Sequence, residues 1–381
     1  MDILLDSYWF DERIQRTEYN DHRMISLHYL CPKLNKGMNK KNRAAAALII
    51  GTIMLSSFAF YIYQILFTPN ILVDQEDRYF AIPEGTTFNE VRNQLYDQRI
   101  INDAVSFSFL SKLKKYDQNI KPGMYLFKKD MSNTAAINML RAGLQTPVKL
   151  TFSTARKIEE LAGKLTNTIM MDSVDLAPLL ISDSVAEAYG FNQQTFISMF
   201  LPNTYEVYWT ISEKELLDRL KKEYDKFWTA ERRAKAKEIG LSPEEITTVA
   251  SIVNAETNFS DEAPIIAGVY LNRLDRGYKL QADPTLKYAL NNFEIRRLLL
   301  KDMEYDSPYN TYKYAGLPPG PINMPSINMI EAVLNYEDHS YLYFCAKDDF
   351  SGRHVFAKSL VEHNVNARKF QNALNQQRIY R

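Results

Sequence analysis

The longest hydrophobic stretch of the chain covers residues 44–67, which read AAAALIIGTIMLSSFAFYIYQILF and contain no charged residue. As an α-helix rising about 1.5 Å per residue, this stretch would reach roughly 36 Å, enough to cross a hydrocarbon core of about 30 Å with some tilt. A buried core helix of this length would normally have a polar face, and a cleaved signal peptide would have a shorter apolar run followed by a cleavage site. We therefore predict an uncleaved transmembrane helix.

The charges on the two sides of this segment differ. Residues 33–43 contain five cations and no acid, whereas residues 74–77 contain three acids and no cation. The positive-inside rule then places residues 1–43 in the cytoplasm and residues 68–381 outside it, in the periplasm, as expected for a single-pass protein of the cell (inner) membrane. Cys31 and Cys345 would lie on opposite sides of the membrane and would not pair. Met38 is a second candidate start, in which case residues 1–37 would be an upstream extension.

A weaker pattern recurs between residues 78 and 225. A short strand, a turn with Ser or Thr, and an amphipathic helix ending in Leu follow one another at 79–95, 125–140, 148–165 and 205–220. Each Ser or Thr is placed to cap its helix, and Ser212 with Glu215 fits a capping box. Units this small must pack together to bury an apolar face. They are either an ordinary α+β scaffold or a binding module for an extended polymer.

Composition narrows the class of protein. The 381 residues suffice for two or three domains, and the 46% hydrophobic and 12% aromatic content provides material for their cores. Basic and acidic residues number 46 each, and this zero net charge argues against a protein that coats nucleic acid. Two cysteines are too few for a disulfide framework or a cysteine-based zinc site.

The segment at residues 241–259, LSPEEITTVASIVNAETNF, predicts a helix that carries chemistry. Ser242 is an N-cap, Pro243 takes the first helical position and Glu245 closes a capping box. An apolar stripe then follows at spacings of three and four, made of Ile246, Val249, Ala250 and Val253.

Glu256 falls at the edge of this apolar stripe, in the last turn of the helix. Partial burial and the negative end of the helix dipole both disfavour the charged carboxylate, so we expect its pKa to be raised. A carboxylic acid protonated near neutral pH can protonate a leaving oxygen. Asn254 and Thr257 are candidate hydrogen-bond partners. From the pattern alone, Glu256 could equally be a surface or capping residue.

Residues 250–290, ASIVNAETNFSDEAPIIAGVYLNRLDRGYKLQADPTLKYAL, resemble the signature of the endolytic murein transglycosylases of the MltG (YceG-like) type. In that family the segment reads approximately ASIVEKET, then an Ala-Gly-Val-Phe-x-Asn-Arg-Leu helix, then Leu-Gln-Ser-Asp-Pro-Thr. The family's catalytic glutamate directly precedes the threonine, so the resemblance assigns this role to Glu256. Asn254 stands where many relatives carry the other glutamate, which favours Glu256 as the single catalytic acid.

The resemblance extends from about residue 40 to the C-terminus. Further matches are FLPNTY at 200–205, Asn272-Arg273, Gln281 with Asp283-Pro284-Thr285, YNTY at 309–312, GLPPGPI at 316–322, then Gly352, His354, Phe356 and residues 362–364. Ala282 replaces the usual Ser. Residues 324–326 are Met-Pro-Ser where the family normally continues Asn-Pro-Gly, so the contacts of that loop are expected to differ.

The residue types and the resemblance together nominate substrate-binding residues, namely Gln281, Asp283, Thr285, Asn310, Tyr312 and His354. Gln281, Asn310 and Tyr312 suit hydrogen bonding to sugars or stacking on them. Asp283 before Pro284 would also serve as a helix N-cap. His354 is expected to follow a strand at 341–346 through a turn and to point into a cleft. His354 and His363 lack the spacing of a helical metal pair, so no metal is expected.

The resemblance implies an α+β protein with a single N-terminal transmembrane helix. The expected parts are a cytoplasmic segment (1–43), the transmembrane helix (44–67), a LysM-like α+β subdomain (75–148) and a mixed α+β catalytic domain (149–381). It also implies a peptidoglycan lytic transglycosylase without a cofactor, which cuts nascent glycan strands near the membrane beside synthases and division or elongation proteins. A hydrolytic muramidase and a non-catalytic wall-binding scaffold are the alternatives.

Overall fold

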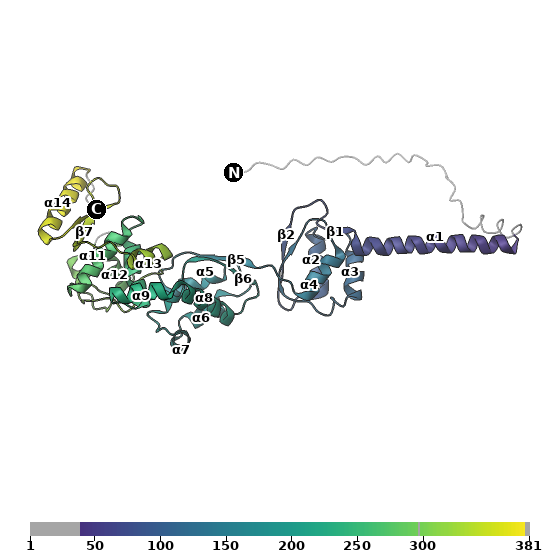
Figure 1. The fold of residues 1–381 in the computed structure, drawn as a ribbon, viewed down its shortest axis with the longest axis horizontal. Helices are drawn as coiled ribbons and strands as arrows, with labels where there is room; N and C mark the ends of the chain where they lie inside the picture. The colour runs from purple at the N-terminus through teal and green to yellow at the C-terminus, as the bar shows by residue number, and fades with distance from the viewer. Residues whose placement is uncertain (1–38, 296–297, 378–381) are drawn as a thin grey trace, which may run out of the picture. The chain divides into compact units, whose positions relative to one another are not determined.

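The computed structural model of the protein describes residues 39–295 and 298–377, and the chain divides into two units, residues 1–68 and 69–381. In the first unit, helix α1 (Lys40–Phe67) contains an 18-residue stretch with a mean hydropathy of 2.0, none of which is buried (Figure 1). It begins slightly earlier than predicted. It is the one helix among the described residues that is long and apolar enough to cross a membrane, and it fits a single-pass membrane protein. The predictions for residues 1–38, including Cys31, lie outside the described residues.

The second unit starts with two small antiparallel sheets. β1 (Pro69–Ile71) pairs with β4 (Met131–Ser132), and β2 (Arg78–Ile82) pairs with β3 (Gly123–Phe127) so that Phe80 faces Tyr125. The accompanying helices are α2 (Phe88–Asp97), α3 (Ala104–Leu113) and α4 (Asn133–Ala142). This part is α+β as expected, and its likeness to a LysM domain stays a prediction.

A third antiparallel pair follows, formed by β5 (Val148–Phe152) and β6 (Asn203–Val207). The helices that accompany it are α5 (Ile158–Thr166), α6 (Ser173–Leu180), α7 (Asp183–Ala188), a 3-10 helix (Phe196–Met199), α8 (Glu213–Phe227) and α9 (Ala230–Ile239). Figure 1 draws the pair beside α5, α6 and α8.

The C-terminal part is mainly helical and ends in a hairpin and a helix. Its elements are α10 (Pro243–Glu256), α11 (Ala263–Asp275), α12 (Asp283–Ala289), a 3-10 helix (Leu300–Glu304), α13 (Ile327–Leu334), β7 (Tyr343–Ala346), β8 (His354–Ala357) and α14 (Leu360–Gln376). β7 and β8 are antiparallel, with Ala346 opposite His354. The strand predicted at 341–346 is therefore confirmed for 343–346, and so is the turn after it.

The recurring strand–helix unit is also confirmed, as β2–α2, β3–α4, β5–α5 and β6–α8. Thr87, Ser132 and Ser212 cap their helices through side-chain oxygens, and Ser212 forms the expected capping box with Glu215. The capping prediction is wrong for α5, which follows Lys157 without a side-chain cap. The hydroxyl residues there lie at 153 and 154, too far ahead of the first turn to reach its N–H groups.

Helix α10 lies at the centre of the C-terminal part and contacts α9, α11, α12 and α13. Ser242, Pro243 and Glu245 begin it as predicted. All eight residues from Ile246 to Val253 are buried, so the helix is enclosed on more than the apolar stripe. The buried hydroxyls of Thr247, Thr248 and Ser251 donate to backbone carbonyls three or four residues earlier in the helix, which satisfies them internally.

Gly268 fixes how closely α11 approaches the segment before β7. A Cβ atom at this position would lie 2.5 Å from the carbonyl oxygen of Glu337 and 2.8 Å from Nε2 of His339. Gly163, within α5, has no atom within 4 Å of the same hypothetical Cβ.

We predict opposite effects for alanine at these two glycines. Gly268→Ala should lower the free energy of unfolding by about 1–3 kcal/mol, because the backbone must shift to admit the methyl group. Gly163→Ala should raise it by about 0.5–1 kcal/mol, because glycine weakens a helix interior. Chemical denaturation of the full chain in detergent measures both, and destabilisation by Gly163→Ala or stabilisation by Gly268→Ala would contradict the packing.

Candidate active site

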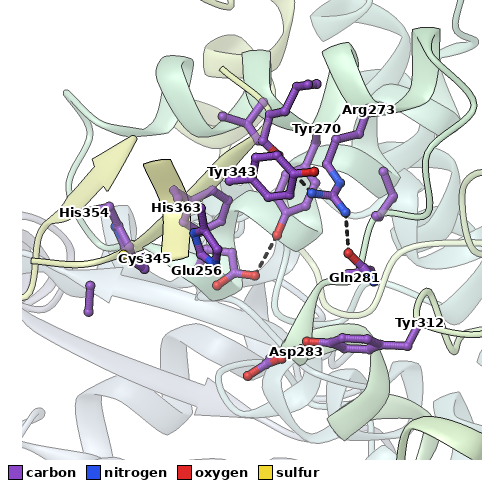
Figure 2. Close-up of a pocket in the computed structure, with 15 residues that line it drawn as sticks. Glu256, Tyr270, Arg273, Gln281, Asp283, Tyr312, Tyr343, Cys345, His354 and His363 are labelled. Atoms are coloured by element: carbon purple, nitrogen blue, oxygen red, sulfur yellow. Dashed lines mark hydrogen bonds between the residues drawn. The ribbon is translucent and has the colours of Figure 1, made fainter. Parts of the chain in front are cut away.

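A pocket of about 500 Å³ opens at the end of α10 (Figure 2). Its walls come from α10, α11, the start of α12, the hairpin β7–β8 and α14, which the fold brings together from distant parts of the sequence. The lining residues are Glu256, Val269, Tyr270, Arg273, Leu280, Gln281, Asp283, Tyr312, Leu342, Tyr343, Phe344, Cys345, Ala346, His354 and His363.

Glu256 is the last residue of α10 and is half-buried in this pocket. The hydroxyl of Tyr270, from α11, donates to its Oε1 at 2.7 Å, as Figure 2 shows. The hydrogen-bond partners expected from sequence were wrong. Asn254 Oδ1 accepts from the backbone N–H of Ser326, and Thr257 Oγ1 accepts from the N–H of Phe259. Both side chains are used to stabilise turns, which leaves the carboxyl group to Tyr270.

Burial raises the pKa of Glu256 to about 7 from an ordinary value of 4.5, and the Tyr270 hydrogen bond opposes this by favouring the charged form. Among the smaller effects, the negative charge of Asp283 raises the pKa and the positive charge of Lys287 lowers it. The raised pKa expected from the sequence is thus present. A carboxyl group with a pKa near 7 can both give and take a proton at neutral pH.

Asp283 and Tyr312 form a second pair in the pocket, in which the Tyr312 hydroxyl donates to Asp283 Oδ1. The prediction that Asp283 is an N-cap is wrong. It is the first residue of α12, Ala282 is the N-cap, and no side chain caps this helix end. Burial and this hydrogen bond raise the pKa of Tyr312, so its phenol keeps its proton. Both side chains of this pair line the pocket.

Arg273 holds the opposite wall in place. Its Nη2 donates to Gln281 Oε1 at 2.6 Å, and its other guanidinium bonds go to the carbonyls of Lys279 and Leu342 (Figure 2). Gln281 adopts a left-handed backbone conformation with φ of 53°. With its oxygen bound to Arg273, the amide nitrogen of Gln281 has no partner among the described residues and is a donor for a ligand.

Thr285 and Asn310 do not line the pocket. Both are fully buried. Thr285 Oγ1 donates to the carbonyl of Ala282, while Asn310 Nδ2 donates to the carbonyls of Met303 and Tyr305. The structure therefore places them beneath the site, where they fix the backbone of the two segments that carry Asp283 and Tyr312. Direct contact with a sugar, as expected from the sequence, does not fit this burial.

His354 lines the pocket at the start of β8, as expected. Both carboxylate oxygens of Glu262 bind it, one at 2.9 Å from its backbone N–H and one at 3.1 Å from Nδ1. Since Glu262 is buried, it fixes the ring and leaves Nε2 for a ligand. The fold thus brings together in one pocket five residues that the sequence nominates, namely Glu256, Gln281, Asp283, Tyr312 and His354.

Sequence reasoning missed Tyr270, Tyr343 and His363 as site residues. Tyr270 follows Glu256 by 14 residues, on the next helix, and nothing in that spacing predicts contact. Position 270 is Tyr where the family pattern has Phe, and this difference is the signal in the sequence that could have identified Tyr270 as a site residue. His363 stacks on Tyr343 with ring centroids 5.4 Å apart, and burial lowers the pKa of its imidazole.

Comparison with known proteins places the chain in a family. The model of the YceG-like family matches residues 80–369, and the chain therefore belongs to the YceG-like family, as its motifs predicted. A solved structure of a putative YceG-like protein from Listeria monocytogenes superimposes with a TM-score of 0.51 at 29% sequence identity, covering 76% of this chain and 98% of that one.

Two similar proteins carry the name endolytic murein transglycosylase. The one from Streptococcus pneumoniae serotype 2 is 27% identical over 354 residues, which is 84% of this chain and 64% of the relative. The one from Bacillus subtilis is 27% identical over 310 residues, which is 77% of this chain and 85% of the relative. The chain thus spans slightly less than two thirds of the length of the pneumococcal protein.

The raised pKa of Glu256 predicts a pH-dependent stability. Below 4.5 the carboxyl is protonated whether the chain is folded or unfolded, and between 4.5 and about 7 only the folded state keeps the proton. Folding stability contributed by this group is therefore lost as the pH rises to about 7, by up to about 3 kcal/mol. Glu256→Gln should show no such loss. The free energy of unfolding of this variant, relative to that of the wild type, should therefore increase between about pH 4 and pH 8. Chemical denaturation at both pH values measures this, and a constant difference would contradict the burial of the carboxyl.

Proposed function

We propose that this protein is an endolytic lytic transglycosylase that cleaves the glycosidic bonds between N-acetylmuramic acid (MurNAc) and N-acetylglucosamine (GlcNAc) in peptidoglycan glycan strands, leaving 1,6-anhydro-MurNAc ends. The observation that carries the proposal is Glu256, a carboxyl with a pKa of about 7 at the wall of a pocket lined with polar groups. The YceG-like family and the names of the two relatives support it.

In the first step, Glu256 donates its proton to the glycosidic oxygen, and the bond between that oxygen and C1 of MurNAc breaks. GlcNAc leaves with a 4-hydroxyl group, and positive charge develops at C1. The negative charge of Asp283, in the same pocket, would stabilise this charge. Gln281, Tyr312 and His354 are the groups proposed to hold the sugars.

In the second step, the 6-hydroxyl oxygen of MurNAc forms a bond to C1. Glu256, now a carboxylate, takes the proton of that hydroxyl and is restored for the next cycle. No water is consumed, because the substrate supplies its own nucleophile. One carboxyl group with a pKa near neutrality can thus perform both proton transfers.

A hydrolytic muramidase is the second candidate, and one observation favours it. Asp283 is a second carboxylate in the pocket, and most glycosidases use two. In a hydrolase, Asp283 would activate water or attack C1, so Asp283→Asn would abolish cleavage. In the transglycosylase it stabilises charge, so the same variant should keep part of its activity.

The apolar helix α1 supports a membrane-anchored enzyme acting on nascent strands. The five cations at residues 33–43 support, through the positive-inside rule, the proposal that the N-terminus is cytoplasmic and that the catalytic domain lies outside the inner membrane, in the periplasm. Residues 75–148 are proposed to bind glycan as a LysM-like subdomain. Synthases and division or elongation proteins would be its neighbours.

The direct test is product analysis with the full chain in detergent. Wild type incubated with sacculi should release fragments with anhydro-MurNAc ends, identified by mass spectrometry. Glu256→Gln should lower the rate by at least about 10³-fold while leaving folding intact, because the group proposed to protonate the glycosidic oxygen is lost. Glu238→Gln, an exposed glutamate outside the pocket, is the matched control.

The outcomes separate the alternatives. Products with only reducing ends would identify a muramidase instead. Undiminished cleavage by Glu256→Gln would remove this residue from the mechanism, and absence of cleavage by the wild type would favour a non-catalytic wall-binding scaffold.

Tyr270→Phe should shift the pH profile. Its hydrogen bond lowers the pKa of Glu256, so its loss should move the alkaline limb of kcat/KM to higher pH. The rate at the optimum should fall less than about tenfold, since one hydrogen bond contributes about 1 kcal/mol. Tyr336→Phe, on the surface, is the control. An unchanged alkaline limb in Tyr270→Phe would disconnect this hydrogen bond from the titration of Glu256.

A further inference from the structure

A second pocket, of about 450 Å³, lies next to the catalytic residue but does not include it. The end of α10 and the start of α12 separate the two pockets and contribute residues to both. Glu256 and Asp283 line the first, while the neighbouring residues Ala255 and Pro284 line the second. The full lining of the second pocket is Thr154, Ala155, Arg156, Glu160, Lys164, Asn254, Ala255, Pro284, Lys287, Phe293, Ile322 and Asn323.

The second pocket is cationic. Arg156, Lys164 and Lys287 line it against one acid, Glu160. None of these three cations forms an ion pair within residues 39–295 and 298–377. The Glu160 carboxylate accepts from the backbone N–H of Arg156 at 3.2 Å, and Lys164 Nζ donates to the backbone carbonyl of Thr154. The Arg156 guanidinium is held over the ring of Phe293, 4.7 Å from its centroid. This arrangement is preorganised for an anion.

Asn323 supplies an unpaired acceptor in the same wall. Its side chain is 8% exposed, and its Nδ2 donates to the carbonyl of Ser251 at 2.8 Å. That bond fixes the orientation of the amide, and its Oδ1 has no donor within the described part of the chain. A buried acceptor without a donor is costly, which marks a place where a ligand N–H group would be stabilising.

Lys287 connects the second pocket to the chemistry. Its charge lowers the pKa of Glu256. The two pockets adjoin, because Glu256 and Ala255 are consecutive residues that each line one of them, as are Asp283 and Pro284, so one ligand can occupy both. Asn254 also lines the second pocket, and its neutral amide adds no negative charge to the wall.

We propose that this second pocket binds the peptide stem of the muramoyl residue that is cleaved, with stem carboxylates on Arg156 and Lys287 and a stem N–H group on Asn323 Oδ1. The inference rests on the proposed function, because it assumes a glycan strand in the first pocket. In a strand that bears stems the lactyl carboxyl of MurNAc is an amide, so the sugars are neutral and the anionic groups are the carboxylates of the peptides. Removing the stem leaves a single lactyl carboxylate beside the ring, without the peptide carboxylates and N–H groups. The enzyme would therefore prefer peptide-bearing strands to stripped ones.

Binding can be measured without cleavage in the full chain carrying Glu256→Gln. The probes are a soluble GlcNAc–MurNAc muropeptide with its stem and the same disaccharide after amidase removes the stem. The stem should tighten binding, and Arg156→Gln should reduce the ratio of the two dissociation constants about tenfold, as expected for one charge-assisted hydrogen bond. Lys287→Gln should reduce this ratio to a similar extent. Because residue 256 is an uncharged Gln in this background, the effect cannot arise through the pKa of Glu256.

Lys149→Gln, an exposed lysine on β5 outside the pocket, is the matched control and should keep the wild-type ratio. Thermal unfolding of each variant separates loss of binding from loss of folding. A ratio unchanged in both pocket variants would overturn the proposal. Displacement of the stem-bearing probe by inorganic pyrophosphate, but not by free stem peptide, would also overturn it and identify a phosphate site.

Failure of this inference is distinct from failure of the proposed function. Wild type that releases no anhydro-MurNAc ends from either kind of strand contradicts the function, whereas wild type that cleaves both kinds at equal kcat/KM contradicts only the role of the second pocket.

Discussion

The withdrawal of the Glu256 carboxyl from water is the constraint on which the site depends. A carboxyl at the end of a helix and partly enclosed by aromatic side chains loses hydration that the protein does not fully replace, so it holds its proton to a pH of about 7. The surrounding groups adjust this effect in opposite directions. The Tyr270 hydroxyl favours the charged form and Asp283 disfavours it, which balances the group between its two protonation states.

Much of the C-terminal part can be understood as support for this position. Helix α10 is buried along eight consecutive residues, so Glu256 emerges at a point fixed by packing on several sides. Gly268 lets α11, the helix that carries Tyr270 and Arg273, pack closely against the segment before β7. Thr285 and Asn310 are buried below the pocket and hold the segments of Asp283 and Tyr312. Rigid support of this kind limits the geometry in which a proton can be transferred.

The sequence predicted local features well. The capping box at Ser242, the apolar spacing of α10 and the helical, charge-free stretch at 44–67 all follow from rules that act within a few residues. It also predicted that Glu256 would be only partly exposed. These features depend on neighbours in the chain, and periodicity reveals them.

Contacts between distant segments could not be predicted in the same way. The sequence suggests Asn254 and Thr257 as hydrogen-bond partners of Glu256. In the structure both side chains instead accept hydrogen bonds from backbone N–H groups that follow them in the chain. The sequence also suggests sugar contacts for Thr285 and Asn310, whose polarity is used inside the fold. The second pocket combines residues from α5, α10, α12 and the loop at 322–323, and only the tertiary fold brings its cations together.

The most direct test of the account is an NMR titration of the Glu256 carboxyl carbon, assigned by difference from Glu256→Gln. The account predicts a midpoint near 7, and a midpoint near 4.5 would contradict it.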